Sequence, residues 1–281
     1  MIVSAFKYHC YGNDFLIVLD STVQTAVRPR LAREFCHRKT GVGADGVIFV
    51  STGPEAAIEI LNRDGSSAQM SGNGLRCAAA QLVHQGEVSG HEVTVDTPAG
   101  KRTLWLIEVG KAKWTFETNM GEPRFRSEEI PFQSTPAVPL VKDYELNAEF
   151  GSLTVTALNV GNPQCVVFVD QLPGDEELSR LGSALERHPC FPEGSNVTFA
   201  KVEGPGHLRI RIWERGVGPT ESSGTGCCGA AVAAIWTGRA HSPVSVESDT
   251  GSQQVAWASG EPIKLVGDAE FVADIDYFWN V

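Results

Sequence analysis

Two copies of one short pattern constrain the fold of this chain more than any other feature. In each copy a serine precedes a Gly-x-Gly turn and an alanine-rich run, at residues 71–83 (SGNGLRCAAAQLV) and 223–236 (SGTGCCGAAVAAIW). Serine is a favoured N-cap residue and alanine is the strongest helix former, so each copy predicts the start of a helix. The copies lie about half a chain apart, which predicts two duplicated halves.

The first turn of a helix exposes unpaired backbone N–H groups and a partial positive charge. Two such ends would make a pocket for a carboxylate, with Ser71 leading one end and Ser223 the other. An isolated serine at this position is usually only a cap. The paired glycine frames, more elaborate than capping requires, favour one shared site that uses the backbone N–H groups of Gly72, Asn73, Gly74, Gly224 and Thr225.

The composition is that of a soluble globular protein. With 281 residues, 42% hydrophobic and 20% charged, the chain can bury one large core or two medium ones, and we expect two. A net charge of -11 argues against a nucleic-acid partner. The N-terminus has neither a basic leader nor an apolar signal region, and no apolar run reaches membrane-spanning length, so we expect no membrane association.

Seven cysteines occur at 10, 36, 77, 165, 190, 227 and 228. The count is odd and no CxxC pair is present, which predicts neither a disulfide framework nor a zinc site. A reducing cytoplasm fits this usage, and most of the cysteines are expected to be small buried apolar residues.

Apolar alternation and turn residues predict many strands and few helices, an α/β (α+β) class. Each half should be a curved, mainly antiparallel sheet with one long helix at its centre. The Pro- and Glu-rich segment 121–141 is expected to cross between two domains. Besides the two repeated helices, helices are expected at 31–37 and 175–187, and strands at 2–8, 15–19, 47–50, 58–61, 92–96, 102–109, 113–119, 151–160, 165–169, 197–202, 207–213, 244–246, 253–257 and 270–275.

Sequence motifs also test two other functional classes, dinucleotide-binding proteins and serine hydrolases. A GxGxxG match at 41–46 is followed by a predicted strand, where a dinucleotide site needs a helix. A second match at 224–229 precedes a helix and has Asp249 further on, but Trp213 ends the preceding strand too far upstream for the glycines to leave it directly. Neither repeated serine has the GxSxG frame of a serine hydrolase.

A series of motifs, in order along the whole chain, resembles the diaminopimelate epimerase family. The resemblance implies two pseudo-symmetric domains, each a mixed sheet wrapped around a central helix, with the active site in the cleft between them. It places one domain at 1–120 plus a C-terminal strand at about 268–281, and the other at 121–267. The motifs are YGNDF (11–15), GADG (43–46), NRDGS (62–66), GNGLRC (72–77), GNP (161–163), SNV (195–197), ERGVG (214–218) and GTG (224–226).

The resemblance implies an isomerase that inverts an amino-acid α-carbon without a cofactor or a metal, converting LL-diaminopimelate to the meso isomer. Family members use two cysteines, one removing a proton and the other delivering one on the opposite face. Here Ser71 and Ser223 occupy both positions, and Gln164 stands where the family has histidine. An alcohol ionises far less readily than a thiol. Either neighbouring groups activate the serines, or the chain has altered chemistry, or it is an engineered cysteine-to-serine variant.

The remaining family contacts match residue by residue. Arg215 suits a carboxylate and Glu214 an ammonium group, although an exposed strand-end pair would be the alternative. A homodimer is also implied, and a related amino-acid racemase or a binding descendant without turnover stays open. The matched amides, which would contact the small-molecule amino-acid substrate, are Asn13, Asn62, Asn162 and Asn196.

Overall fold

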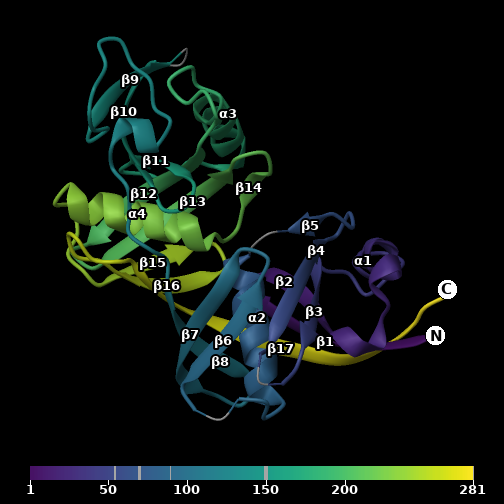
Figure 1. Cartoon of the computed structure of the whole chain (residues 1–281). Helices are drawn as coiled ribbons and strands as arrows, with labels where there is room; N and C mark the ends of the chain where they lie inside the picture. The colour runs from purple at the N-terminus through teal and green to yellow at the C-terminus, as the bar shows by residue number, and fades with distance from the viewer. Residues whose placement is uncertain (54, 69–70, 89, 149–150, 281) are drawn as a thin grey trace. The chain divides into compact units, whose positions relative to one another are not determined.

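The computed structural model describes residues 1–53, 55–68, 71–88, 90–148 and 151–280. The chain divides into two compact units, and each is a mixed α+β structure in which strands predominate, as the sequence predicts (Figure 1). Unit 1 comprises Met1–Thr118 and Gly267–Val281, and unit 2 comprises Asn119–Val266.

The sheet of unit 1 closes on itself around one helix. Neighbouring strands pair in the order β17, β1, β2, β3, β4, β6, β7 and β8, and β8 pairs again with β17. Strand β1 pairs antiparallel with β17 and with β2, and the pairs β3–β4, β6–β7 and β7–β8 are also antiparallel. The pairs β2–β3 and β4–β6 are parallel. The elements are β1 (Ile2–Cys10), β2 (Asn13–Leu19), α1 (Arg28–Phe35), β3 (Gly46–Ser51), β4 (Ala57–Asn62), β5 (Ser67–Ala68), α2 (Gly72–His84), β6 (Glu92–Thr97), β7 (Gly100–Val109), β8 (Lys113–Asn119) and β17 (Lys264–Phe278), with 3-10 turns at Asp20–Thr22 and Thr25–Val27.

Helix α2 fills the closed sheet because its side chains are small. Ala78, Ala79 and Ala80 are each fully buried and pack in one core cluster with apolar side chains of the surrounding strands. A helix buried on all sides needs no polar stripe, which explains why the alanine-rich run shows none. A second cluster lies on the other face of strands β1 to β3, where α1 covers them.

Unit 2 repeats this element order. Strands β10 and β11 precede α3, then β12 to β14 precede α4, and β15, β16 and the start of β17 follow, as β1 to β8 do in unit 1. The parallel pairs recur at the same places, β11 with β12 and β13 with β15. The elements are β9 (Tyr144–Ala148), β10 (Gly151–Asn159), β11 (Pro163–Phe168), α3 (Asp175–Glu186), β12 (Asn196–Gly204), β13 (His207–Glu214), β14 (Gly218–Thr220), α4 (Gly224–Trp236), β15 (Val244–Ser248) and β16 (Gly251–Ala256), with a 3-10 turn at Ser127–Glu129.

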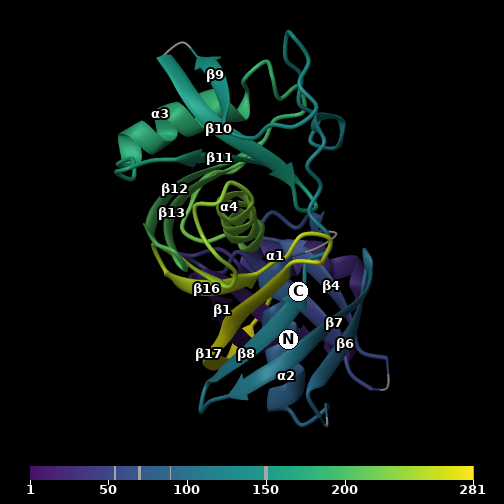
Figure 2. The ribbon, with the colours of Figure 1, turned by 90° about the vertical axis from the view of Figure 1, so that its left-hand side faces the viewer.

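Helix α4 occupies the place in unit 2 that α2 has in unit 1, with β12, β13 and β16 curving around it (Figure 2). Its alanines from Ala230 to Ala234 are fully buried. The second GxGxxG match lies inside this helix, not in a loop before it. That position argues against a dinucleotide-binding site, because the GxGxxG fingerprint needs its glycines in the turn between strand and helix.

Several predicted boundaries were wrong. Helix α1 begins at Arg28, three residues before the expected start, because Pro29 is compatible with a first helical turn. Strand β17 runs from Lys264 to Phe278 and is much longer than the expected 270–275, since it pairs with β16 at one end and with β1 along the rest. The short strands β5, β9 and β14 were not expected.

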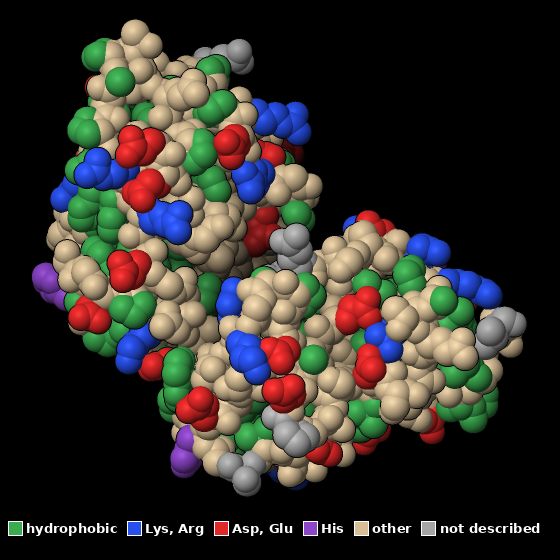
Figure 3. All heavy atoms as spheres, viewed as in Figure 1, with side chains coloured by type: hydrophobic (Ala, Val, Ile, Leu, Met, Phe, Trp, Pro, Cys, Tyr) green, Lys and Arg blue, Asp and Glu red, His purple; other side chains and the backbone are tan. Residues whose placement is uncertain are grey.

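Among the described residues, no helix is both long and apolar enough to cross a membrane. On the face shown in Figure 3, Lys and Arg side chains are interspersed with Asp and Glu. Within the same residues, no group of three or more His, Cys, Asp or Glu side chains is arranged to hold a metal ion.

Candidate active site

The first candidate half-site lies at the start of α2. Ser71 is the N-cap, with extended backbone, and its Oγ accepts a hydrogen bond of 3.0 Å from the Gly74 N–H. A Cβ at Gly74 would lie 3.2 Å from both Ser71 Cβ and the Ile48 side chain. A side chain there would press against both the cap and β3, which glycine avoids.

Amide side chains surround this helix start. Asn73 Nδ2 donates to Asn13 Oδ1 at 3.2 Å, and Asn13 stands at the beginning of β2, directly after the Tyr11-Gly12 turn. Both turn residues have positive φ, 52° and 86°, the geometry of a tight two-residue hairpin. We call Ser71, Asn73 and Asn13 the unit 1 half-site.

Asn62 lies at the same sheet edge. It ends β4 opposite Gly46, and Gly46 is in register with Phe15 of β2. Its Nδ2 donates to Ser66 Oγ at 2.9 Å, and the side chain is exposed. No hydrogen bond among the described residues joins Asn62 to the unit 1 half-site.

The second candidate half-site lies at the start of α4 and repeats the first. Ser223 is the N-cap and accepts from the Gly226 N–H at 3.3 Å. Asn162 Nδ2 donates to Thr225 Oγ1 at 3.4 Å, which matches the Asn73–Asn13 contact of unit 1 in position. The hydroxyls of Ser223 and Thr225 are also 3.4 Å apart. We call Ser223, Thr225, Asn162 and Glu214 the unit 2 half-site.

Glu214 is the titratable group of the unit 2 half-site. It ends β13 and is half-buried. Burial raises the pKa of Glu214 above its usual value, and a hydrogen bond from the Ser223 hydroxyl lowers it by a smaller amount. A carboxylate with a raised pKa is a stronger base than an ordinary one, and it lies within hydrogen-bond reach of the serine that leads α4.

Arg215 and Asn196 are joined through backbone contacts. Asn196 is buried at the start of β12; its Oδ1 accepts from the Arg215 N–H at 3.1 Å, and its Nδ2 donates to Pro163 O at 2.9 Å. The Arg215 side chain is exposed and donates to Glu193 O at 2.9 Å. Asn196 therefore fixes the strand end that carries Glu214 and Arg215.

Gln164, at the position of the family's histidine, is fully buried. Its Nε2 donates to Asn162 Oδ1 at 2.7 Å, while its Oε1 has no hydrogen-bond partner among the described residues. A Cβ at Gly229 would lie 2.9 Å from the Gln164 side chain, so glycine in α4 makes room for it. The hydrogen bond from Gln164 thus fixes the orientation of the Asn162 side-chain amide.

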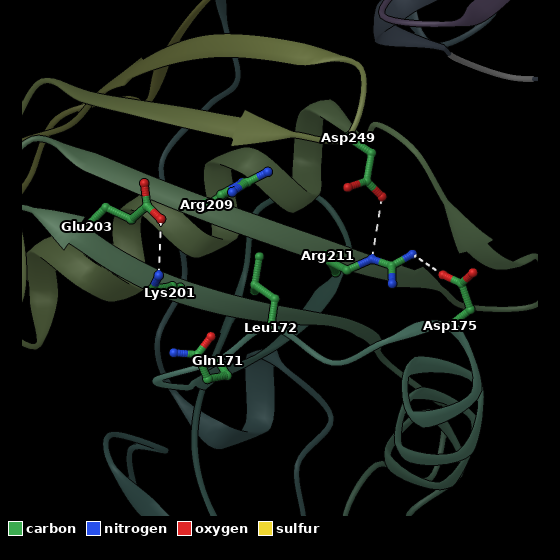
Figure 4. Close-up of a pocket in the computed structure, with 8 residues that line it drawn as sticks. All are labelled: Gln171, Leu172, Asp175, Lys201, Glu203, Arg209, Arg211 and Asp249. Atoms are coloured by element: carbon green, nitrogen blue, oxygen red, sulfur yellow. Dashed lines mark hydrogen bonds and ion pairs between the residues drawn. The ribbon is translucent and has the colours of Figure 1, made fainter.

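A separate cavity of ≈ 500 Å³ lies on unit 2, away from these residues (Figure 4). Its charges already neutralise one another: Arg211 pairs with Asp175 at 2.7 Å and with Asp249 at 3.4 Å, and Lys201 pairs with Glu203 at 3.3 Å. None of its lining residues belongs to either half-site. We therefore do not take this cavity as the active site.

Comparison with known proteins decides the family. A family model described as diaminopimelate epimerase matches residues 5–126 and 156–272. The diaminopimelate epimerase of Desulfitobacterium hafniense is 38% identical over 273 residues, 95% of each chain. That of Moorella thermoacetica is 39% identical over 255 residues, 90% of each chain. The chain belongs to the diaminopimelate epimerase family.

Solved structures show that the fold is shared more widely than the family. A phenazine biosynthesis protein of the PhzF family from Bacillus anthracis matches with a TM-score of 0.69 at 16% identity, covering 99% of this chain and 100% of that one. A hydroxyproline epimerase from Agrobacterium vitis matches with a TM-score of 0.65 at 18% identity, covering 98% and 92%. At such low identity the likeness concerns the fold alone.

Within the diaminopimelate epimerase fold, two acidic residues near the half-sites had not been singled out for a role. Asp45 lies in the GADG motif, and its Oδ2 accepts from Asn13 Nδ2 at 2.8 Å. Glu186, near the end of α3, accepts from Trp213 Nε1 at 2.6 Å and from the Gly216 N–H at 2.9 Å, which supports the turn after Glu214. The GADG motif marks the position of Asp45 but does not indicate its partner, and Glu186 lies in no motif, so only the folded contacts reveal these roles.

Proposed function

We propose that this protein converts LL-diaminopimelate to meso-diaminopimelate by moving a proton off one face of the α-carbon and onto the other. The observation that carries the proposal is the twin serine-capped helix start. Each half-site offers backbone N–H groups for a carboxylate and a serine oxygen at the position of a family cysteine. Inversion needs a proton acceptor on one face of the α-carbon and a proton donor on the other, and each half-site supplies one serine for these roles.

The substrate contacts follow from the same proposal. The backbone N–H groups of the first turns of α2 and α4 would bind the reacting carboxylate and stabilise the charge that develops on it. Arg215 would pair the distal carboxylate. Glu214 has two alternative roles, pairing with a substrate ammonium group or accepting a proton from Ser223, and its hydrogen bond with Ser223 favours the second. The neighbouring amides Asn13, Asn62, Asn162 and Asn196 would complete the recognition of the two amino-acid ends.

The serines favour a second candidate function, a binding descendant that keeps the pocket without turnover. The Ser223–Glu214 contact argues for some remaining proton transfer, because a carboxylate with a raised pKa can accept the serine proton. No corresponding carboxylate contacts Ser71 among the described residues, where its Oγ accepts from Gly74. The chemistry of the two half-sites is therefore unequal.

Calorimetry with LL- and meso-diaminopimelate tests the substrate, and proton NMR in deuterium oxide tests turnover. We expect saturable heat with these isomers and much weaker binding of lysine, which lacks the distal carboxylate. No heat with either isomer, or equal binding of lysine, would remove the substrate assignment. Binding without any formation of the other isomer would favour the binding descendant.

We also propose a homodimer and no bound cofactor or metal. Ile2 and Phe278 pair across β1 and β17 and are 57% and 75% exposed, and Val272 of β17 is 50% exposed. Exposed apolar side chains on one pair of strands are typical of an association surface. Light scattering after size-exclusion chromatography should give a dimer mass, and Phe278→Glu should give a monomer; a monomeric parent chain would refute this.

A cytoplasmic location is part of the same proposal. Seven cysteines, an odd number without a CxxC pair, suit a reducing compartment.

A further inference from the structure

A chain of hydrogen bonds with a single direction passes through the first turn of α2. Arg76 Nη2 donates to Asn73 Oδ1 at 2.6 Å, and Asn73 Nδ2 donates to Asn13 Oδ1 at 3.2 Å. Asn13 Nδ2 then donates to Asp45 Oδ2 at 2.8 Å. Two amides of the unit 1 half-site are thus held between a cation and a carboxylate.

The charged ends fix the orientation of both amides. A guanidinium group only donates hydrogen bonds and a carboxylate only accepts them, whereas an amide can exchange its oxygen and nitrogen by rotating half a turn. If either Asn73 or Asn13 rotated, two donors or two acceptors would face each other. With Arg76 at one end and Asp45 at the other, only the observed orientation satisfies every link.

Asp45 is itself firmly held. Its Oδ1 accepts from Arg38 Nη2 at 2.8 Å, and its Oδ2 also accepts from the Asp14 N–H at 3.2 Å. Its own N–H donates to Asp14 O at 2.9 Å, which ties the residue before β3 to the first residues of β2. One carboxylate oxygen therefore accepts from Arg38, and the other accepts from Asn13 and from the Asp14 N–H.

This arrangement leaves one N–H of each amide without a hydrogen-bond partner among the described residues, and Asn73 itself lies in the first turn of α2. We propose that Asp45 is a positioning residue that presents the amides of Asn13 and Asn73 as donors to the substrate carboxylate. The identity of that ligand rests on the proposed function. A purely structural Asp45 would contribute its ion pair with Arg38 and leave the amides unaffected.

A double-mutant cycle with Asp45→Asn and Asn73→Asp tests the directed chain without any ligand. Each single change sets a donor against a donor or an acceptor against an acceptor. In the double variant Asn13 can rotate, donate to position 73 and accept from position 45, so every link is restored in reverse. In Asp45→Asn the new amide has one oxygen, so it loses either its contacts on the Asn13 side or its contact to Arg38, and the cycle measures how far Asn73→Asp compensates that loss.

We expect each single variant to melt lower than the parent, and the double variant to lose less than the sum of the two losses. The difference should be about 2–4 °C, the shift that one hydrogen bond produces in a chain of this size. Hydrogen bonds link residues 45 and 73 through Asn13. If the losses in melting temperature of the two single variants simply add in the double variant, the proposed chain of hydrogen bonds is wrong.

Ligand affinity tests the positioning role. Asp45→Asn should weaken LL-diaminopimelate binding roughly tenfold, and the double variant should stay weak although its stability recovers, because an acidic group now lies at the helix start. Lys7→Met is the matched control: it removes an ion pair with Asp14 in the same cluster, at 2.9 Å, without touching the amides. We expect it to change affinity less than about threefold.

Unchanged affinity in Asp45→Asn, or an equal loss in Lys7→Met, would refute the positioning role. If the parent chain gives no heat with diaminopimelate, the substrate assignment fails but the melting cycle still decides the hydrogen-bond chain. In that case a titration with sodium acetate, followed through the side-chain amide NMR signals of Asn13 and Asn73, decides the positioning role. Those signals should move in the parent and stay still in Asp45→Asn, and no movement in the parent would refute it.

Discussion

Replacing both helix-capping serines by cysteine should greatly accelerate the inversion of diaminopimelate. A thiol with a pKa near 8.5 is about 3% ionised at pH 7. An alcohol, which ionises about as weakly as water with its pKa of 15.7, is ionised at roughly one part in 10⁹. The change of atom at Ser71 and Ser223 therefore raises the fraction of ionised base by about 10⁷.

The helix start adds much less than the change of atom. The N-terminus of a helix stabilises a negative charge by typically about 0.3–1 kcal/mol, which lowers a thiol pKa by roughly 0.2–0.7. That shift raises the ionised fraction to at most about 14%. Both helices have 13 residues, and in each the serine oxygen accepts from a backbone N–H, at 3.0 Å in α2 and 3.3 Å in α4. The helix start should therefore lower the thiol pKa by a similar amount at both positions.

The assay is proton NMR in deuterium oxide, with loss of the α-proton signal and formation of the meso isomer followed over hours. Ser71→Cys with Ser223→Cys should form meso-diaminopimelate far faster than the parent chain, and each single variant should be slower than the double. If the serines are only caps, the double variant loses about 1 kcal/mol of stability and gains no activity. A parent chain that already inverts at the rate of the double variant would refute the reasoning.

Three further outcomes test the half-sites. Ser71→Ala and Ser223→Ala should each cost about 1 kcal/mol and lower the melting temperature by about 2–4 °C, measured by calorimetry, because each removes an N-cap acceptor. Because the pKa of Glu214 is raised in the folded chain, its stabilising effect is present below its usual pKa and is lost as the pH rises through the raised value. Glu214→Gln should therefore raise the unfolding free energy at pH 7 and give no gain below about pH 4, and a gain of equal size at both would contradict this. Arg215→Ala should weaken diaminopimelate binding by about 2 kcal/mol, the low end for a charged contact, since the side chain is exposed; unchanged calorimetry would remove Arg215 from the site.

The sequence predicted the features that depend on local chemistry. The repeat at Ser71 and Ser223 identified both central helices, because N-cap preference and alanine content act within a few residues. The strands expected at 2–8 and 15–19 form the hairpin that turns at Tyr11 and Gly12. The alternating strands were found wherever one face is buried, as in β1 and β6.

Features that depend on distant partners were not predictable. The three-residue strand β14 exists because it pairs with β13, and β17 extends far beyond its apolar run because β1 and β16 supply partners along it. The same limit applies to the site. The GADG motif contains Asp45, but the motif could not show its partner, because Asn13 lies 32 positions away in the sequence.

The duplicated half-sites share a backbone but differ in what they can do with a proton. In unit 1 the amides of Asn13 and Asn73 and the guanidinium of Arg76 accept no proton at neutral pH. The Cys10 thiol donates to Asn73 O at 3.4 Å and makes no hydrogen bond to Ser71 among the described residues. In unit 2, Thr225 takes the place of Asn73, and the Ser223 hydroxyl meets Glu214, which can accept its proton.

A thiol should therefore matter more at Ser71 than at Ser223. At position 223 the Glu214 carboxylate already supplies a base, and its negative charge opposes ionisation of a neighbouring thiol. At position 71 a thiol would supply a base where no carboxylate contacts the serine among the described residues. Ser71→Cys alone should thus raise the rate of meso-diaminopimelate formation above that of Ser223→Cys alone, measured by the same NMR assay. The reverse order would show that Glu214 does not act through Ser223, and that the proton acceptor of unit 2 must be sought elsewhere.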